Sequence, residues 1–154
     1  MTEQSGFEKM GSAKASFFDA VAHVKELGIT LEDVGPGAAT LKLDYQDRLV
    51  GNLETGVLAG GVVTTLLDTA AGVSVIAALG NFQPLATLGL RIDYLTPATP
   101  QRAVLARSHC YRITRWIAFV RGVAYHDNID DPIANFTATF MATGDRPFAR
   151  PQGA

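Results

Sequence analysis

The chain reads GVVTTLLDTAAGVSVIAAL from Gly61 to Leu79 and continues with Gly80-Asn81. This run predicts one long apolar helix, and the Gly-Asn pair after it is typical of a helix end. Between Val62 and Leu79 its only charge is Asp68. A charge at the centre of a membrane span costs about 2.5 to 3.5 kcal/mol on insertion, so we predict a buried core helix rather than a membrane span.

Upstream of this helix, the spacing of the apolar residues changes once, from a helical pattern to an alternating one. Residues 5–27 begin with Ser5 and Glu8, a possible capping box, and place apolar residues at helical spacing up to Leu27, followed by Gly28. From Ile29 the apolar residues alternate, with Val34 one place out of step, and the break at 35–37 reads Gly-Pro-Gly. We therefore predict a helix over 5–27, then two strands joined by a turn, and an irregular segment over 46–59.

Downstream of the long helix the pattern is almost entirely that of strands. We expect them over 85–95, 103–113, 116–125 and 133–142, and the short turns between them favour antiparallel pairing. A single long helix with several long strands predicts an α+β domain in which a curved antiparallel sheet wraps the helix. We predict one domain over 1–154, with an N-terminal helical segment over 1–28 and a flexible tail over 146–154.

Composition excludes several classes of protein. The 154 residues include 13 Lys and Arg against 15 Asp and Glu, so there is no basic surface of the kind that binds nucleic acid. The N-terminus carries no basic stretch followed by an apolar run, which favours the cytoplasm. Cys110 is the only cysteine, and it lies beside His109 on what would be opposite strand faces, so we expect an inert thiol. None of the three histidines, at 23, 109 and 126, has metal-ligand spacing, so we expect no metal.

The polar residues of the long helix lie on one side of it. At 100° per residue, one stripe of about 140° collects the glycine and polar positions from 61 to 72: Gly61, Thr64, Thr65, Asp68, Thr69 and Gly72. Glycines at a helix N-terminus expose N–H groups that can stabilise a carbonyl oxyanion, and Asp68 about 10 Å further along can act as a base or nucleophile. This spacing suits acyl transfer. The alternative is structural: Gly60 and Gly61 make a tight turn, and Asp68 is a hydrogen-bonded residue at a subunit contact.

The stretch from Asn52 to Ala70, NLETGVLAGGVVTTLLDTA, resembles the hot-dog fold acyl-CoA thioesterases of the PaaI-like family. The runs Ala86 to Pro97 and Thr114 to Gly122 resemble later strands of that family. The resemblance implies hydrolysis of acyl-CoA to free acid and CoA without a cofactor, by a homodimer or homotetramer whose sites combine residues of both protomers. It assigns these roles: Asp68 activates the water or attacks directly, the Gly60 N–H holds the thioester oxygen, Asn52 polarises the carbonyl, and Thr87 assists the water. We further predict that three residues of the polar stripe bind the substrate: Gly61, Thr64 and Thr65.

One position departs from the family pattern. The histidine that precedes the glycine pair in the family is Ala59 here. This loss leaves the backbone donor and the carboxylate in place but removes an imidazole close to the thioester. Two hypotheses therefore stay open: an active thioesterase, and a non-catalytic acyl-CoA binding protein.

Overall fold

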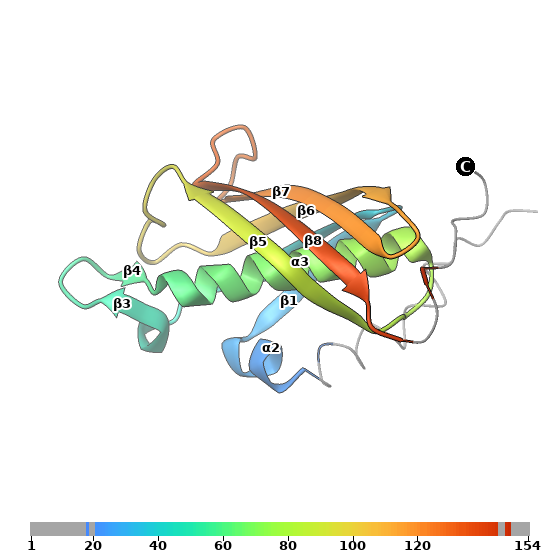
Figure 1. Cartoon of the computed structure of the whole chain (residues 1–154). Coiled ribbons are helices and arrows are strands. Elements are labelled where there is room, and N and C mark those ends of the chain that lie inside the picture. The colour runs from blue at the N-terminus through green and yellow to red at the C-terminus, as the bar shows by residue number, and fades with distance from the viewer. Residues whose placement is uncertain (1–17, 19–20, 145–146, 149–154) are drawn as a thin grey trace, which may run out of the picture.

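The computed structural model describes residues 18, 21–144 and 147–148, and one helix and six long strands make up most of this part. The first half contains α2 (Ala22–Leu27), β1 (Ile29–Gly35), β2 (Ala38–Leu43), the 3-10 turn η2 (Asp47–Leu49), β3 (Val50–Asn52) and β4 (Val57–Leu58). The second half contains α3 (Gly60–Leu79), β5 (Leu85–Tyr94), β6 (Val104–Ile113), β7 (Ile117–Tyr125) and β8 (Ala134–Ala142) (Figure 1).

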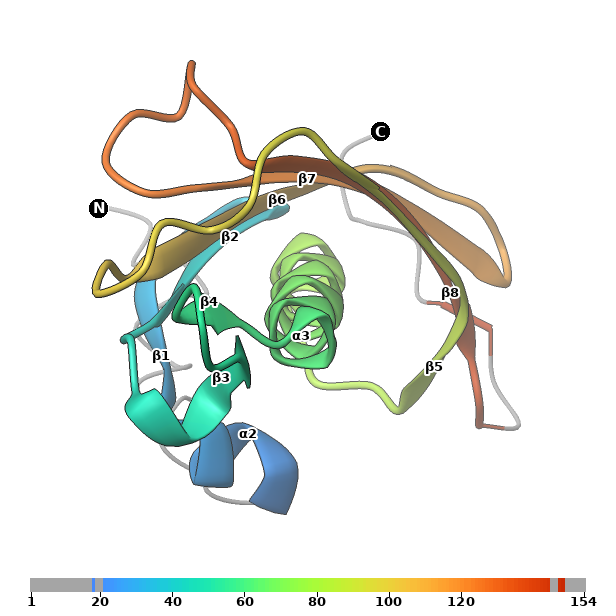
Figure 2. The same cartoon turned by 90° about the vertical axis from the view of Figure 1, so that its left-hand side faces the viewer.

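The long strands form one curved sheet. Its order is β1-β2-β6-β7-β8-β5, and every neighbouring pair is antiparallel. Seen along α3, the sheet arches over the helix from β1 on one side to β5 on the other and leaves one side of the helix open (Figure 2). The predicted α+β fold, a long helix wrapped by a curved antiparallel sheet, is confirmed.

The helix α3 is the core of the molecule. Leu66, Leu67, Ala70, Ala71 and Val75 are fully buried, and the helix packs mainly against β2 and β6. Within the described residues it is the one helix long and apolar enough to cross a membrane, yet 67% of its most apolar 18-residue window is buried inside the molecule. It ends at Gly80, whose left-handed conformation (φ 69°) suits glycine and whose N–H donates to the Ile76 carbonyl.

The strands follow the predicted alternation of buried and exposed residues. In β8 the buried positions alternate strictly with the others, and large Phe136 lies opposite Gly122 of β7. A Cβ at Gly122 would come within 2.4 Å of the Phe136 ring and 2.3 Å of the Arg107 carbonyl oxygen. Gly122 therefore makes room for an aromatic ring that fills the space between sheet and helix.

The structure also explains the irregular position of Val34. The register of β1 against β2 shifts between Leu31 and Asp33, which is a β-bulge. One extra residue at that point reverses the side on which the following residues lie. The break in the alternation of apolar residues at Val34 therefore indicated this β-bulge.

The four late strands pair antiparallel, as predicted, with β5 beside β8 because the loop after β5 crosses the sheet to the position next to β2. Two other expectations need correction or restriction. Residues 46–59 were expected to be irregular but contain η2 and the short hairpin β3–β4. Of the helix predicted over 5–27, the structure describes α2 and Phe18, and the capping box lies outside the described residues.

The predicted flexible tail over 146–154 lies almost wholly outside the described residues. Of that segment Pro147 and Phe148 are described. Phe148 is 4% exposed, and its N–H donates to the Arg115 carbonyl at 3.0 Å. At this residue the chain is held against the sheet by burial and a backbone hydrogen bond.

Candidate active site

The hairpin β3–β4 fixes the start of α3. The Ala59 N–H donates to the Leu49 carbonyl at 2.9 Å, and the Ala59 backbone approaches so closely that a Cβ at Gly51 would lie 2.7 Å from the Ala59 Cα. The helix begins at Gly60, one residue earlier than predicted, and Ala59 provides no side-chain cap. The Val62 N–H donates to the Ala59 carbonyl at 3.0 Å. The N–H groups of Gly60 and Gly61 have no partner within the helix, so they remain available to an anion or a carbonyl oxygen.

The predicted polar stripe lies along the open side of α3. Gly61 is exposed, and Thr64, Thr65, Asp68 and Thr69 are half-buried. The threonine hydroxyls donate back into the helix, from Thr64 to the Gly60 carbonyl and from Thr65 to the Gly61 carbonyl, both at 3.0 Å. Their hydrogens are therefore occupied, and what these side chains can offer a substrate is hydroxyl oxygen as an acceptor and methyl surface.

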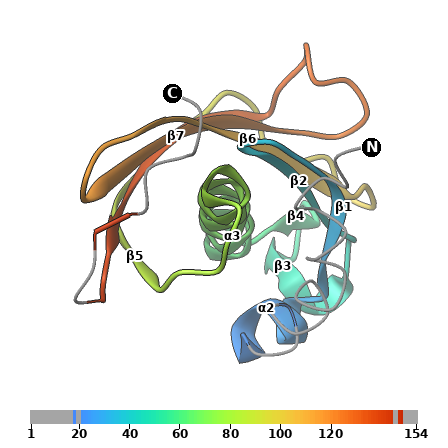
Figure 3. The same cartoon turned by 90° about the vertical axis from the view of Figure 1, so that its right-hand side faces the viewer.

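Asp68 and Thr87 meet in the structure. The Thr87 hydroxyl, near the start of β5, donates to Asp68 Oδ1 at 2.9 Å. This bond fixes one oxygen of the carboxylate. Oδ2 has no hydrogen-bond partner among the described residues, so it can accept a proton or a hydrogen bond from a water molecule. Figure 3 shows the loop after α3 that carries the chain to the start of β5. Two residues that lie 19 positions apart in sequence thus form one polar unit.

Asn52 is engaged in a local turn. Its Oδ1 accepts the N–H groups of Glu54 at 3.0 Å and Thr55 at 3.2 Å, which is an Asx turn within the hairpin. The carbonyl oxygen of this side chain is therefore occupied by the hairpin. Its amide nitrogen makes no hydrogen bond to any residue in the described part of the chain, so a role toward a substrate would rest on that donor.

Two side chains that the sequence analysis did not assign to the site lie beside it. His23 of α2 has its Nε2 3.3 Å from the Thr65 hydroxyl, one helical turn from Asp68. The Tyr94 hydroxyl, at the end of β5, donates to the Gly60 carbonyl at 3.3 Å. No local pattern marks either residue, because each reaches α3 only through the tertiary arrangement of the fold.

A hollow of about 290 Å³ opens beside Asp68 and Thr87. It lies between α2, α3, the loop before β5 and the inner side of β8, and Val24, Ile76 and Phe140 contribute apolar surface. Of the described residues that line it, Asp68 is the one that can ionise. The chemistry of this hollow is therefore a carboxylate at the edge of an apolar space.

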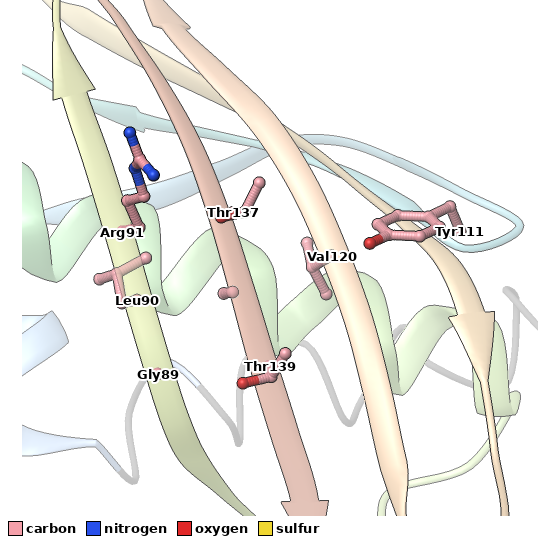
Figure 4. A pocket seen from close by; sticks show the side chains of 8 residues that line it. Gly89, Leu90, Arg91, Tyr111, Val120, Thr137 and Thr139 are labelled. Carbon is pink, nitrogen blue, oxygen red and sulfur yellow. The ribbon is translucent and has the colours of Figure 1, made fainter.

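A second hollow, of about 470 Å³, lies on the outer side of the sheet (Figure 4). Arg91, Tyr111, Thr137 and Thr139 line it. Arg91 forms a salt bridge with Asp93 at 3.0 Å, on an exposed surface. This second hollow contains neither a carboxylate nor the start of α3, so it does not combine the groups that acyl transfer needs.

The remaining candidate groups have structural positions. His126 accepts the Thr99 N–H at Nε2 (2.9 Å), and its Nδ1 lies 2.7 Å from the Ala103 carbonyl, so both nitrogens are engaged in holding loops. Cys110 is buried while His109 is exposed, as expected for neighbours on a strand. Among the described residues no group of three or more His, Cys, Asp and Glu is placed to hold a metal ion.

A glycine-rich helix start, a carboxylate on the same helix and a curved sheet around it define the hot-dog thioesterases as a class. Residues 55–133 match the sequence model of the thioesterase superfamily, and the chain belongs to this superfamily. This confirms the family predicted from the sequence.

Relatives and solved structures agree with this assignment. A medium/long-chain acyl-CoA thioesterase, YigI of Escherichia coli, is 31% identical over 130 residues, which cover 76% of this chain and 83% of the relative. A Pseudomonas aeruginosa protein of known crystal structure is 40% identical with a TM-score of 0.77, covering 86% of this chain and 98% of that one. The PaaI protein of the Escherichia coli phenylacetic acid degradation operon is 17% identical with a TM-score of 0.76, covering 88% and 94%, and shares the fold.

Proposed function

We propose that this protein hydrolyses acyl-CoA thioesters to a free acid and CoA. The observation that carries the proposal is the Asp68–Thr87 pair at the edge of an apolar hollow, on the helix that begins with Gly60 and Gly61. Membership of the thioesterase superfamily and relatives named acyl-CoA thioesterases support it.

The proposed reaction needs an electrophile activated at one point and a nucleophile activated at another. The Gly60 N–H donates to the thioester oxygen and stabilises the negative charge that develops there. Asp68 accepts a proton from a water molecule whose oxygen attacks the carbonyl carbon, or attacks that carbon itself. In the second case an anhydride of Asp68 forms when the thiolate leaves, and a water molecule then hydrolyses it to the free acid and the carboxylate. When the tetrahedral intermediate collapses, the C–S bond breaks, and the sulfur leaves as thiolate and takes up a proton.

A single chain does not bring these two points together. Gly60 and Asp68 are eight residues apart on one helix, about 12 Å along its axis, whereas reacting atoms approach to about 3 to 3.5 Å. The strand β5 runs back along α3, with Thr87 beside Asp68 and Tyr94 beside Gly60. It is also an edge strand of the sheet, with Leu88 and Tyr94 each 53% exposed.

These facts support a site shared by two copies of the chain in a homodimer or larger homo-oligomer, which we place in the cytoplasm as predicted from the sequence. If two copies of β5 pair antiparallel about their midpoint, near Leu90, the Thr87 end of one strand lies beside the Tyr94 end of the other. Asp68 of one protomer then faces the start of α3 in the second. Each dimer contains two such sites, related by the twofold axis.

The first test measures free thiol release from short, medium, long and aromatic acyl-CoAs by the wild type and by Asp68→Asn. Removing a general base typically lowers kcat by about 10² to 10⁴. The half-exposed position of Asp68 means that the melting temperature should hardly change. Full activity of Asp68→Asn on every substrate would overturn the assignment of Asp68.

The second test addresses the shared site. Gly60→Pro removes the N–H, and it suits the first position of a helix because Ala59 is already extended (φ −60°, ψ 134°). A heterodimer of Gly60→Pro and Asp68→Asn chains, purified through two different tags, contains one intact site. It should recover about half of the wild-type activity, although each parent homodimer has almost none. No recovery would place both groups in one chain.

Ala59 favours a second candidate, the non-catalytic acyl-CoA binding protein. Calorimetry with a non-hydrolysable acyl-CoA, run beside the thiol assay, separates the two: binding without any release supports the binding protein. Ala59→His is the matched variant. It should raise the activity of a catalytically weakened enzyme and change little in an enzyme that has compensated for the loss.

A further inference from the structure

We propose that Gly72 determines the acyl-chain specificity of this protein, by leaving room for a straight aliphatic chain in the hollow beside Asp68. This inference rests on the proposed function, because it assigns the part of the substrate that the hollow takes. It adds a specificity residue and the chemical class of the acyl group.

The hollow extends from the reacting groups along α3. Asp68 and Thr87 line one part of it, and Gly72 and Ile76 follow one and two turns further along the same helix. A chain attached to a carbonyl at Asp68 would therefore pass Gly72 after about 6 Å and Ile76 after about 12 Å. The side opposite α3 is provided by α2 through Val21 and Val24.

Gly72 is not required by the packing of the protein itself. It is buried within α3, where glycine is less favourable than alanine because its backbone loses more conformational freedom on folding. A Cβ at this position would lie 3.8 Å from Leu85 Cδ1 and 3.8 Å from Phe140 Cε1, both ordinary contact distances. Gly122 differs completely, since a Cβ there would overlap its neighbours. Among residues 18, 21–144 and 147–148, no side chain fills the space that a Cβ at Gly72 would take.

The residues that line the hollow determine which acyl groups can bind in it. Among the described residues, no Lys, Arg or His lines the hollow, and Asp68 at the reacting end is the one ionisable group. An anionic acyl group would therefore be buried there without a positive partner, which is unfavourable. The volume of about 290 Å³ is at the lower end of the range for ligand pockets, so it suits the acyl part and not a whole CoA thioester.

The position of α2 is well fixed, so it can serve as a wall. Val24 and Leu27 are buried at 2% and 6% exposure. The Gln46 side-chain amide donates to the Leu27 carbonyl at 2.9 Å, and Arg48 bonds Glu26 at 3.1 Å. Val21, by contrast, is 36% exposed, so it can be shortened with little effect on folding.

The experiment compares kcat/KM for saturated acyl-CoAs of increasing length, from butyryl to palmitoyl, in the wild type, Gly72→Ala and Gly72→Val. Filling the space should lower kcat/KM for the longer chains by about ten- to a hundredfold in the Val variant, less in the Ala variant, and leave butyryl-CoA nearly unchanged. Val21→Ala should shift the preference to longer chains. Ala22→Val, an exposed change on α2 outside the hollow, should leave the profile unchanged.

The result that overturns the inference is an equal loss for every chain length, or no change, in a Gly72 variant that melts like the wild type. Gly72→Ala keeps the test decisive even if the Val variant folds poorly, because its Cβ meets only ordinary contacts. Failure of the proposed function looks different: the wild type then releases no thiol from any acyl-CoA, and Asp68→Asn has no effect.

Discussion

Compared with the side of α3 that faces β2 and β6, the open side is more exposed and far more polar. The enclosed side is made of Leu66, Leu67, Ala70 and Ala71, all at 0% exposure. Where polar groups do enter it, they are satisfied: the Ser108 hydroxyl donates to the Ala70 carbonyl at 2.7 Å. The described residues contain no buried side-chain nitrogen or oxygen without a hydrogen-bond partner.

The open side has the opposite character. It presents Asp68, the threonines and the first N–H groups of the helix. Residues that are adjacent in the sequence of α3 point about 100° apart around the helix. One residue of such a pair can therefore pack into the core while its neighbour takes part in the reaction. Substitutions on the enclosed side should therefore change stability alone, and those on the open side should change turnover alone.

The adjacent pair Leu67 and Asp68 gives the sharpest test of this separation. Leu67→Ala leaves a cavity in the core and should lower the free energy of unfolding by about 2 to 5 kcal/mol. The value of kcat per folded molecule should stay within about twofold, because Leu67 is fully buried and lies outside the hollow beside Asp68. Denaturant unfolding and thiol release measure the two effects. A loss of kcat comparable to that of Asp68→Asn would break the comparison.

Gly122 tests the enclosed side from the sheet. Gly122→Ala places a Cβ against the Phe136 ring and the Arg107 carbonyl, and it should destabilise the protein by about 3 kcal/mol, the upper part of the range for overpacking. Gly89→Ala is the matched control, since its Cβ would meet Thr139 Oγ1 at 3.5 Å, an ordinary contact. Equal melting temperatures for the two variants would contradict the packing described here.

Thr87 tests the open side with a smaller change. Thr87→Val keeps the shape of the side chain but removes the hydroxyl that donates to Asp68. Hydrogen bonds to charged groups contribute about 1.5 to 3 kcal/mol, so kcat/KM should fall by about ten- to a hundredfold. Thr87→Ser retains the hydroxyl and should keep most of the activity. If Val and Ser behave alike, the hydroxyl has no part in turnover.

The smallest expected effect concerns Cys110 on the enclosed side. Burial raises the pKa of this thiol to about 11, and hydrogen bonds with the backbone of Arg112 and Phe119 oppose the shift only in part. Since the reactive thiolate forms only as the pH approaches that value, a thiol reagent at pH 8 should label the native protein very slowly. Denaturant should allow complete labelling. Rapid labelling of native protein would show that this part of the core opens.

Local features were predictable because they depend on neighbours in sequence. The stripe on α3 follows from 100° periodicity, and the ends of β5 to β8 lie within one residue of the expected bounds. The bulge in β1 was visible as the displaced Val34. The pairing of β5 with β8 was not, because the choice between possible strand neighbours depends on non-local packing.

The site residues divide in the same way, into those that the sequence indicated and those that only the tertiary arrangement brings to the site. Asp68 and Thr87 were singled out, the first on its spacing and the second on resemblance alone, and the fold brings them within 2.9 Å. His23 could not be assigned to the site from the sequence, because nothing in its own helix indicates that α2 lies against Thr65. Asn52 carried a signal that pointed to its turn, since an Asn four residues before Gly56 is typical of one.

The edge strand β5 has one further consequence, if both of its ends belong to shared sites. A newly made chain would then fold without being able to act, and activity would arise only when it meets a second copy. Specific activity should therefore fall on dilution below the dimer dissociation constant, following mass action, and return on concentration. In a cell, the concentration of this protein would determine both how much enzyme is present and what fraction of it is dimeric and active.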